Sequence, residues 1–229
     1  MPARSERARA TQIVRRLLRE YPPDHPARPH AKTRDPLSEL IFTTLSQNTS
    51  DLNRDRAWAS MKRAFPTWKD VLAARTPDLE RAIAVGGLAK TKAPRIQAIL
   101  REVIDREGRA SLARLKRMSD EEVVAYLEAL PGIGPKTIAC VLAFSLGRPR
   151  LPVDTHVQRV GSRLGIFHER ANVRAAQAAI EAAVPPRDRV ETHLALIAHG
   201  RTTCTALRPA CDRCVLADLC PSAGRVSVQ

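Results

Sequence analysis

The chain has 229 residues, with 38 Lys or Arg against 24 Asp or Glu, and a net charge of +14 at pH 7. This excess of positive charge favours a polyanionic partner, nucleic acid before membrane, while an apolar content of 44% excludes a disordered basic tail. No run approaches the ~18 apolar residues of a membrane span, and the charged N-terminus lacks the apolar region of a signal peptide. We therefore expect a cytoplasmic protein with reduced thiols.

Helical periodicity dominates the sequence, and strand signals are nearly absent. Apolar stripes at helical spacing run through residues 13–18 and 37–45. Thr76 followed by Pro77 is typical of an N-cap and the first helical position. These patterns predict an all-α protein of roughly ten short helices.

The helix signals continue through the second half of the chain. Pro94 is expected to open a helix that Gly108 ends. Ser119 and Glu122 fit a capping box, and an Ala-rich helix is expected over 175–184. No linker of low complexity separates these elements, so any division into domains must come from packing.

Four of the five cysteines lie close together near the C-terminus, with six, two and five residues between them: Cys204, Cys211, Cys214 and Cys220. Thiols so closely spaced in a reducing compartment indicate a metal or cluster site rather than disulfides. Sulfur ligation suits zinc or an iron–sulfur cluster, and the spacing alone leaves both open. Cys140 lies in an apolar run and is expected to be a buried core thiol.

A glycine-containing turn, LPGIGPKT at residues 130–137, separates two helical patterns. Glycine permits left-handed backbone and a close approach of a ligand to the main chain, and Pro135 suits the first position of the next helix. The free N–H groups of such a turn can bind a backbone phosphate without any base contact. A plain connection between two helices is the alternative interpretation.

Lys136 stands in the first turn of that helix, where the helix dipole disfavours a cation. A lysine so placed is a candidate nucleophile for a Schiff base, or alternatively a solvated phosphate contact. Asp154 is expected to cap a helix over 155–164, and its carboxylate could also take a proton or stabilise positive charge. His156, in the first turn of that helix, is either a phosphate contact or an ordinary surface histidine.

The turn with Lys136, the VDTH segment with Asp154 and the spacing of the four cysteines together resemble endonuclease III. This family is the iron–sulfur branch of the helix–hairpin–helix DNA glycosylases, and the resemblance extends from about residue 30 to Cys220. It implies two helical lobes: a six-helix lobe with the hairpin over 29–148, and a cluster lobe from 1–28 and 149–229 with its cluster loop at 204–220. It also implies a [4Fe–4S] cluster held by the four cysteines.

The activity that the resemblance implies is a bifunctional DNA glycosylase and AP lyase. Such an enzyme removes oxidised pyrimidines from duplex DNA in base excision repair and cuts at the abasic site by β-elimination. Lys136 would be the Schiff-base nucleophile and Asp154 its catalytic partner. We expect a monomer in the nucleoid, with these DNA contacts: Gln47 or Asn48 as a polar wedge, Leu88 as an apolar wedge, Gly132, Ile133 and Gly134 as a phosphate clamp, and His156 and Arg208.

The sequence departs from the family pattern at three places. Arg208 is the only basic residue between the first two cysteines of the loop, where the family often has several. Pro135 stands where a basic residue is common, and the wedge segment 45–51 lacks the usual Ser-Ala-Gln order. The lesion preference is therefore open.

Four other functions were weighed. The adenine-excising branch of the superfamily has no lysine at the position of Lys136 and uses a glutamate where this chain has Thr43 and Thr44. A thymine or uracil mismatch glycosylase is a closer alternative. A non-catalytic, structure-specific DNA-binding protein would need neither Lys136 nor Asp154, and a zinc-ribbon protein would be colourless where an iron–sulfur protein is brown.

Overall fold

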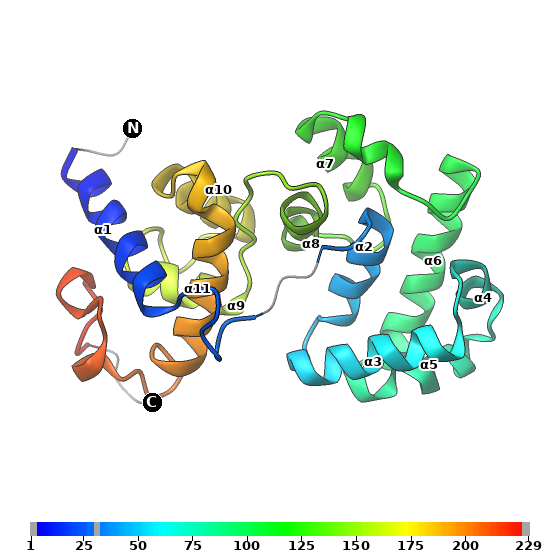
Figure 1. Cartoon of the computed structure of the whole chain (residues 1–229), viewed down its shortest axis with the longest axis horizontal. Helices are drawn as coiled ribbons and strands as arrows, with labels where there is room; N and C mark the ends of the chain where they lie inside the picture. The colour runs from blue at the N-terminus through cyan, green and yellow to red at the C-terminus, as the bar shows by residue number, and fades with distance from the viewer. Residues whose placement is uncertain (1–3, 30–32, 226–229) are drawn as a thin grey trace. The chain divides into compact units, whose positions relative to one another are not determined.

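The computed structural model describes residues 4–29 and 33–225. Within these residues the chain forms eleven α-helices, several short 3₁₀ and π segments and no strand, which confirms the predicted all-α class (Figure 1). Contacts divide the chain into unit 1, Met1–Ala31 with Arg148–Gln229, and unit 2, Lys32–Gly147. None of the helices in the described part of the chain has the length and apolar composition needed to cross a bilayer.

Unit 2 is built from helices around one apolar core. Leu40, Ile83 and Ile96 are among its fully buried side chains, and Cys140 is 4% exposed, as expected for a core thiol. Burial of this kind is the main favourable term in folding. The elements of unit 2 are α2 (Pro36–Leu45), α3 (Asp51–Ala64), α4 (Trp68–Ala73), α5 (Thr76–Ile83), η1 (Ala84–Gly86), α6 (Ala89–Glu107), η2 (Ala113–Arg117), α7 (Asp120–Glu128), α8 (Pro135–Cys140) and the π segment η3 (Val141–Ser145).

Unit 1 has its own core, in which Leu17, Val157 and Ala198 are fully buried. Helix α11 packs against both α1 and α9, as the blue, orange and yellow-green ribbons of Figure 1 show. After α11 the chain has only short 3₁₀ turns. The elements of unit 1 are α1 (Arg4–Glu20), α9 (Thr155–Arg163), α10 (Val173–Ala183), η4 (Pro186–Asp188), α11 (Arg189–Thr202), η5 (Cys211–Arg213) and η6 (Ala217–Leu219).

Several helix ends lie where the sequence predicts them. The capping box of Ser119 and Glu122 is formed at the start of α7. Pro135 is the first residue of α8, and Asp154 caps α9. Gly108 ends α6 with a φ of +70°, a conformation in which glycine pays no steric penalty.

The prediction that Pro94 opens a helix is wrong, because α6 begins at Ala89 and contains Pro94. The carbonyl of Leu88 accepts hydrogen bonds from the amides of Thr91 and Lys92, which starts the helix earlier. Lys92 and Ala93 are buried. Tertiary contacts of this first turn therefore offset the one helical hydrogen bond that proline cannot donate.

The N-cap predicted at Thr76 lies one residue earlier, at Arg75. The hydroxyl of Thr76 instead donates a hydrogen bond of 2.8 Å to Oε1 of Gln97, a residue that is almost fully buried. A buried amide needs such partners. The Thr76 side chain, which local propensity predicts as the helix cap, therefore forms a tertiary hydrogen bond instead.

Candidate functional site

The hairpin before α8 is shaped by Gly132, which has a φ of +71°. A Cβ added at this residue would lie 2.6 Å from Nε of Arg95, so any other residue would strain the backbone and displace the Arg95 side chain. The next residue, Ile133, is 8% exposed and packs into the core of unit 2. The buried isoleucine anchors the hairpin while its two glycines stay at the surface of the turn.

The hairpin offers several free backbone donors. Within the described residues, the N–H groups of Gly132, Gly134 and Lys136 donate to no protein acceptor. The first N–H groups of a helix have no partner within the helix, and they favour an anion there. This turn can therefore hold a phosphate through main-chain N–H groups, as the sequence pattern predicts.

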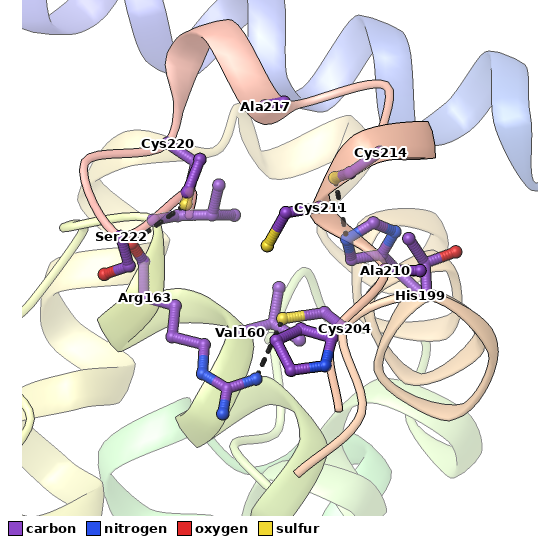
Figure 2. Close-up of a pocket in the computed structure, with 14 residues that line it drawn as sticks. Val160, Arg163, His199, Cys204, Ala210, Cys211, Cys214, Ala217, Cys220 and Ser222 are labelled. Carbon is purple, nitrogen blue, oxygen red and sulfur yellow. Dashed lines mark hydrogen bonds between the residues drawn. The ribbon is translucent and has the colours of Figure 1, made fainter. Parts of the chain in front are cut away.

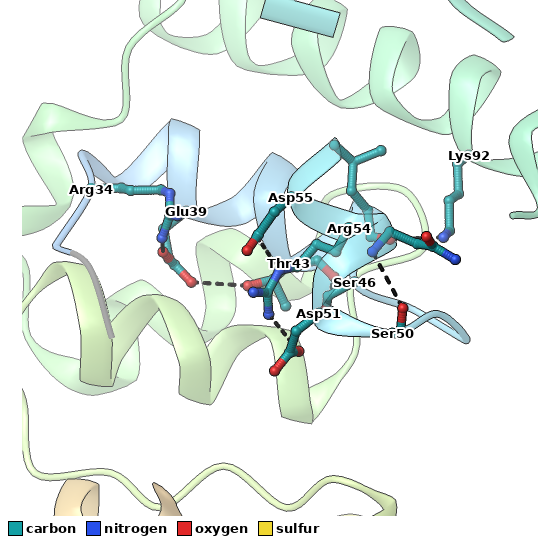
Figure 3. Close-up of polar contacts among 11 residues, drawn as sticks. Arg34, Glu39, Thr43, Ser46, Ser50, Asp51, Arg54, Asp55 and Lys92 are labelled. Atoms are coloured by element: carbon teal, nitrogen blue, oxygen red, sulfur yellow. Dashed lines mark hydrogen bonds and ion pairs between the residues drawn. The ribbon is translucent and has the colours of Figure 1, made fainter. Parts of the chain in front are cut away.

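Lys136 is half-buried at the second position of α8. Its positive charge favours the ionised form of Glu39 on α2, a carboxylate that is 4% exposed. Burial raises the pKa of Glu39, while Arg34, Thr43 and Lys136 oppose that shift. Figure 3 shows Glu39 between its two hydrogen-bond donors, the Thr43 hydroxyl at 3.1 Å and the Arg34 guanidinium at 3.4 Å. The predicted nucleophile, Lys136, and the buried carboxylate of Glu39 thus belong to the same unit, and the charge of the lysine partly offsets the cost of burying the carboxylate.

The predicted wedge residues lie on two turns of unit 2. Asn48 is exposed, whereas Oε1 of the half-buried Gln47 accepts a hydrogen bond of 3.1 Å from Nη1 of Arg95. Leu88 is 52% exposed, so its apolar side chain is available for contact with a ligand. Asn48 and Leu88 both have a φ of +51°, and they are the two non-glycine residues with positive φ in the described part of the chain.

Asp154 and His156 lie at the start of α9 in unit 1. Oδ1 of Asp154 accepts from the amide of Val157 at 2.8 Å, so this oxygen is committed to the cap. Nδ1 of His156 lies 3.1 Å from Nη2 of Arg159. Burial lowers the pKa of this imidazole, and a hydrogen bond with the backbone of Gly200 opposes that shift.

The four C-terminal cysteines line one pocket that is partly open to solvent; its empty space, open solvent included, is about 400 Å³ (Figure 2). Val160, Leu164 and Ala217 form part of its apolar wall. Nε2 of the buried His199 lies 3.7 Å from Sγ of Cys214, and the amide of Leu216 donates to the same sulfur at 3.4 Å. Burial lowers the pKa of His199 to about 4, so its ring is neutral.

Arginine side chains from two helices hold the segment that contains the cysteines. From α9, Arg163 donates to Sγ of Cys204 at 3.4 Å, and Arg159 donates to the carbonyl of Cys204 at 3.1 Å. From α1, Arg16 donates to the carbonyl of Val215 and forms an ion pair with Asp218. The segment has little regular structure, and these donors fix its path. Arg208 is exposed on it.

This donor set fits an iron–sulfur cluster. The four thiols surround the cavity, and hydrogen bonds already reach the sulfurs of Cys204 and Cys214. Hydrogen bonds to ligand sulfurs and a dry, apolar wall are the features by which proteins tune such clusters. Among the described residues, no three His, Cys, Asp or Glu side chains meet closely enough to hold a single metal ion.

Known proteins match both the helical region and the cysteine segment. Residues 41–186 match the HhH-GPD superfamily of base excision DNA repair proteins, and residues 204–220 match the iron–sulfur binding domain of endonuclease III. Endonuclease III of Escherichia coli K12 is 31% identical over 222 residues, which are 97% of this chain and 99% of that protein. The chain belongs to the endonuclease III family. It is a DNA glycosylase and AP lyase of base excision repair, it binds DNA, and its cofactor is a [4Fe–4S] cluster.

Two further relatives extend this result. A trapped endonuclease III–DNA covalent intermediate, an estranged-adenine complex, superposes with a TM-score of 0.80 at 28% identity, covering 94% of this chain and 97% of that one. An Arabidopsis thaliana protein, provisionally named as a DNA glycosylase, is 39% identical over 165 residues. That match covers 72% of this chain, which spans 56% of the plant protein's length.

The sequence reasoning missed the polar residues that support these sites, such as Lys92, Arg95 and Glu39. Lys92 lies four residues before Ile96 and seven before Ile99, on the buried stripe of α6. A charged residue at a core position of an apolar stripe was the available signal. The arginines of α9 gave no such signal, because their partners lie more than 40 residues away in the chain.

Proposed function

We propose that this enzyme removes oxidised pyrimidines from duplex DNA and then cuts the strand at the abasic site, with Lys136 as nucleophile. One observation supports this most directly: free backbone donors at Gly132 and Gly134 lie immediately before Lys136. The hairpin can therefore grip a phosphate while the lysine amine stands two residues beyond the second glycine. The class of lesion is the one that the resemblance to endonuclease III implies.

The damaged nucleotide is first extruded from the helix, because its reacting atoms are out of reach within the base stack. Asn48 and Leu88 occupy the space that the nucleotide leaves. Damage weakens stacking and pairing, so a damaged base is cheaper to extrude than an intact one. Phosphates on either side are held by the hairpin N–H groups of Gly132 and Gly134, and further contacts come from His156 and Arg208.

The chemistry then proceeds in two steps. Nζ of Lys136 bonds to C1′ of the sugar, the glycosidic bond breaks, and the base leaves with the bonding electron pair and takes up a proton. Asp154 accepts the proton of the attacking amine or stabilises positive charge on the sugar. The C1′–O4′ bond of the sugar then breaks, O4′ takes up a proton, and C1′ and Nζ form a Schiff base. The Schiff base acidifies the proton on C2′; a base removes this proton, a double bond forms between C2′ and C3′, and the 3′ phosphate leaves, which cuts the strand. The covalent DNA intermediate trapped with a relative supports this route.

Cys204, Cys211, Cys214 and Cys220 hold the cluster in this proposal. When bound, the cluster supplies a crosslink that fixes a segment with few backbone hydrogen bonds of its own. The residues that act on DNA all belong to one chain, so the enzyme works as a monomer.

Borohydride trapping tests the proposal. Duplexes with thymine glycol or an abasic site are incubated with wild-type protein, Lys136→Gln, and the exposed control Lys116→Gln. We expect a covalent protein–DNA band on both duplexes for the wild type and the control, and none for Lys136→Gln. A band on the abasic site alone would reject the assigned lesion. A Lys136→Gln protein that still forms the band would reject the nucleophile.

A further inference from the structure

A fully buried lysine in unit 2 has no part in the chemistry proposed above. Lys92 on α6 is 1% exposed, and its Nζ donates to the carbonyls of Leu45, at 2.7 Å, and Gly86, at 2.8 Å. Among the described residues it forms no ion pair, and burial lowers its pKa. Burying an ammonium group without a counter-ion costs free energy. We therefore expect the two hydrogen bonds of Lys92 to have a structural role.

The two acceptors of Lys92 are the last residues of two helices. Leu45 ends α2, and Gly86 ends the 3₁₀ helix η1. Carbonyls at helix ends lack partners and carry partial negative charge, which an ammonium can satisfy. Lys92 therefore caps both helices at once and fixes the distance between their ends, which lie 41 residues apart in the sequence.

Each capped end leads directly into a turn with a strained residue. Asn48 follows Leu45 by three residues, and Leu88 follows Gly86 by two. A φ of +51° costs a side chain such as asparagine or leucine on the order of 1 kcal/mol, and it is kept only where surrounding contacts over-determine it. The turns also adjoin each other, because a Cβ added at Gly87 would lie 3.9 Å from the carbonyl oxygen of Asn48.

One turn further along α6, Arg95 contacts both the Asn48 turn and the hairpin. Its Nη1 donates to Oε1 of Gln47 at 3.1 Å. Its Nε packs against Gly132 of the hairpin, 2.6 Å from the position that a Cβ on this glycine would take. Residues three apart share one face of a helix, so one face of α6 contacts three segments: the Asn48 turn, the Leu88 turn and the hairpin.

We propose that Lys92 and Arg95 are positioning residues that fix the two wedge turns and the phosphate-binding hairpin in one arrangement, so that nucleotide extrusion is driven by a preformed surface. This inference rests on the proposed function. It assigns the polar wedge to Asn48, because the amide of Gln47 is held by Arg95 while Asn48 is exposed. Neither positioning residue takes part in bond making or breaking.

Fluorescence of 2-aminopurine next to a non-cleavable abasic analogue tests extrusion without chemistry. Lys92→Met and Arg95→Met are compared with wild type and with the control Arg101→Met, an exposed residue of the same helix. We expect wild type and Arg101→Met to raise the fluorescence at saturating protein. Lys92→Met and Arg95→Met bind the duplex but raise it much less. Arg95 is half-buried, so its variant remains informative if Lys92→Met fails to fold.

Excision kinetics supply the second measurement. We expect Lys92→Met and Arg95→Met to lower single-turnover excision of a fully paired lesion by about tenfold or more, the effect of leaving buried polar groups unpaired. In a bubble duplex, where extrusion is cheap, excision should return to within about threefold of wild type. Equal losses on both duplexes would overturn the positioning role, and so would full fluorescence with either variant.

The two proposals fail in different ways. If the wild-type protein raises the fluorescence but excises no oxidised pyrimidine, the proposed substrate is wrong and the positioning role stands. If it excises the lesion and both variants behave like wild type, the positioning role is wrong and the proposed function stands.

Discussion

The guanidinium of Arg163 donates a hydrogen bond of 3.4 Å to Sγ of Cys204. Arg163 is the last residue of α9, the helix that Asp154 caps. The same guanidinium donates to the carbonyls of Thr205 and Ala206, at 2.7 and 2.8 Å. Helix α9 thus has the proposed catalytic carboxylate at its start, and at its end an arginine that binds the first cysteine of the cluster segment. The path of that segment depends on this arginine.

Replacing Arg163 by Met removes these donors and leaves their acceptors unpaired. We expect the free energy of unfolding to fall by about 2 kcal/mol, the usual effect of losing a charged, partly buried hydrogen-bond donor. The cluster should also decay faster, as measured by visible absorbance during incubation with a chelator. The exposed Arg170 provides the control, since Arg170→Met should match the wild type. Identical cluster decay in both variants would contradict the role of Arg163.

The five cysteines divide into two groups that iron analysis can separate. Cys211→Ser removes one of the four thiols that line the cavity, and we expect iron content and brown colour to be lost. Cys140 lies in the core of unit 2, so Cys140→Ala should keep its full iron content. It should lose only about 1 kcal/mol of stability through the small cavity left behind. Iron retained in Cys211→Ser would remove that residue from the ligand set.

Two substitutions at Asp154 separate its cap from its chemistry. Asn is as good an N-cap as Asp, because its side-chain oxygen can accept the same bond from the amide of Val157. Asp154→Asn should therefore keep the melting temperature while single-turnover excision falls by about a hundredfold, the contribution of one acid–base group. Asp154→Ala should lose excision to a similar degree and also about 1 kcal/mol of stability. Wild-type excision by Asp154→Asn would leave the residue a purely structural role.

Much of the fold could be predicted because its signals are local. A capping box such as Ser119 with Glu122 needs only residues three apart in sequence, and the helix start at Pro135 needs only one. The cysteine spacing is local in the same way. By itself it predicts a metal or cluster site, and the [4Fe–4S] cluster that the resemblance implies is confirmed by the match of residues 204–220. Where a few neighbouring residues decide a structure, the sequence predicts it well.

The remainder depends on distant partners. The Thr76 hydroxyl binds Gln97 instead of capping its helix, and the start of α6 before Pro94 depends on the burial of Lys92. The choice between Gln47 and Asn48 as wedge also stayed open, since it turns on Arg95, 48 positions along the chain. Such side chains have several possible partners in the sequence, and only the packed structure selects one.

The two hairpin glycines predict opposite outcomes for the same substitution. Gly132 has a φ of +71° and no room for a Cβ beside Arg95, whereas nothing lies within 4 Å of a Cβ built on Gly134. Gly132→Ala should lower the free energy of unfolding by about 1 kcal/mol or more through backbone strain and weaken binding to duplex DNA. Gly134→Ala keeps its N–H and should match the wild type in both. Thermal melts and DNA titrations measure the difference, and equal stability of the two variants would contradict the geometry.

The buried carboxyl of Glu39 makes stability depend on pH. Burial raises its pKa above the ordinary value of 4.5, although Arg34, Thr43 and Lys136 reduce the shift. Between the unfolded and folded pKa values, the native state binds the extra proton. Stability therefore falls as pH rises through this window, which opens near 4.5 and extends upward. Above the folded pKa the contribution of the proton is lost.

Glu39→Gln removes this proton linkage and keeps an oxygen that can accept from the Thr43 hydroxyl. The free energy of unfolding of the variant minus that of wild type should therefore rise as pH increases above 4.5, and it should level off above the folded pKa. Urea unfolding at several pH values measures this difference. Because the two proteins share all their other titratable groups, the contributions of those groups cancel in the subtraction. The exposed Glu121→Gln is the control, and its difference from wild type should stay flat. A flat difference for Glu39→Gln as well would contradict the raised pKa and show that the contacts with Arg34, Thr43 and Lys136 cancel the effect of burial at this carboxyl.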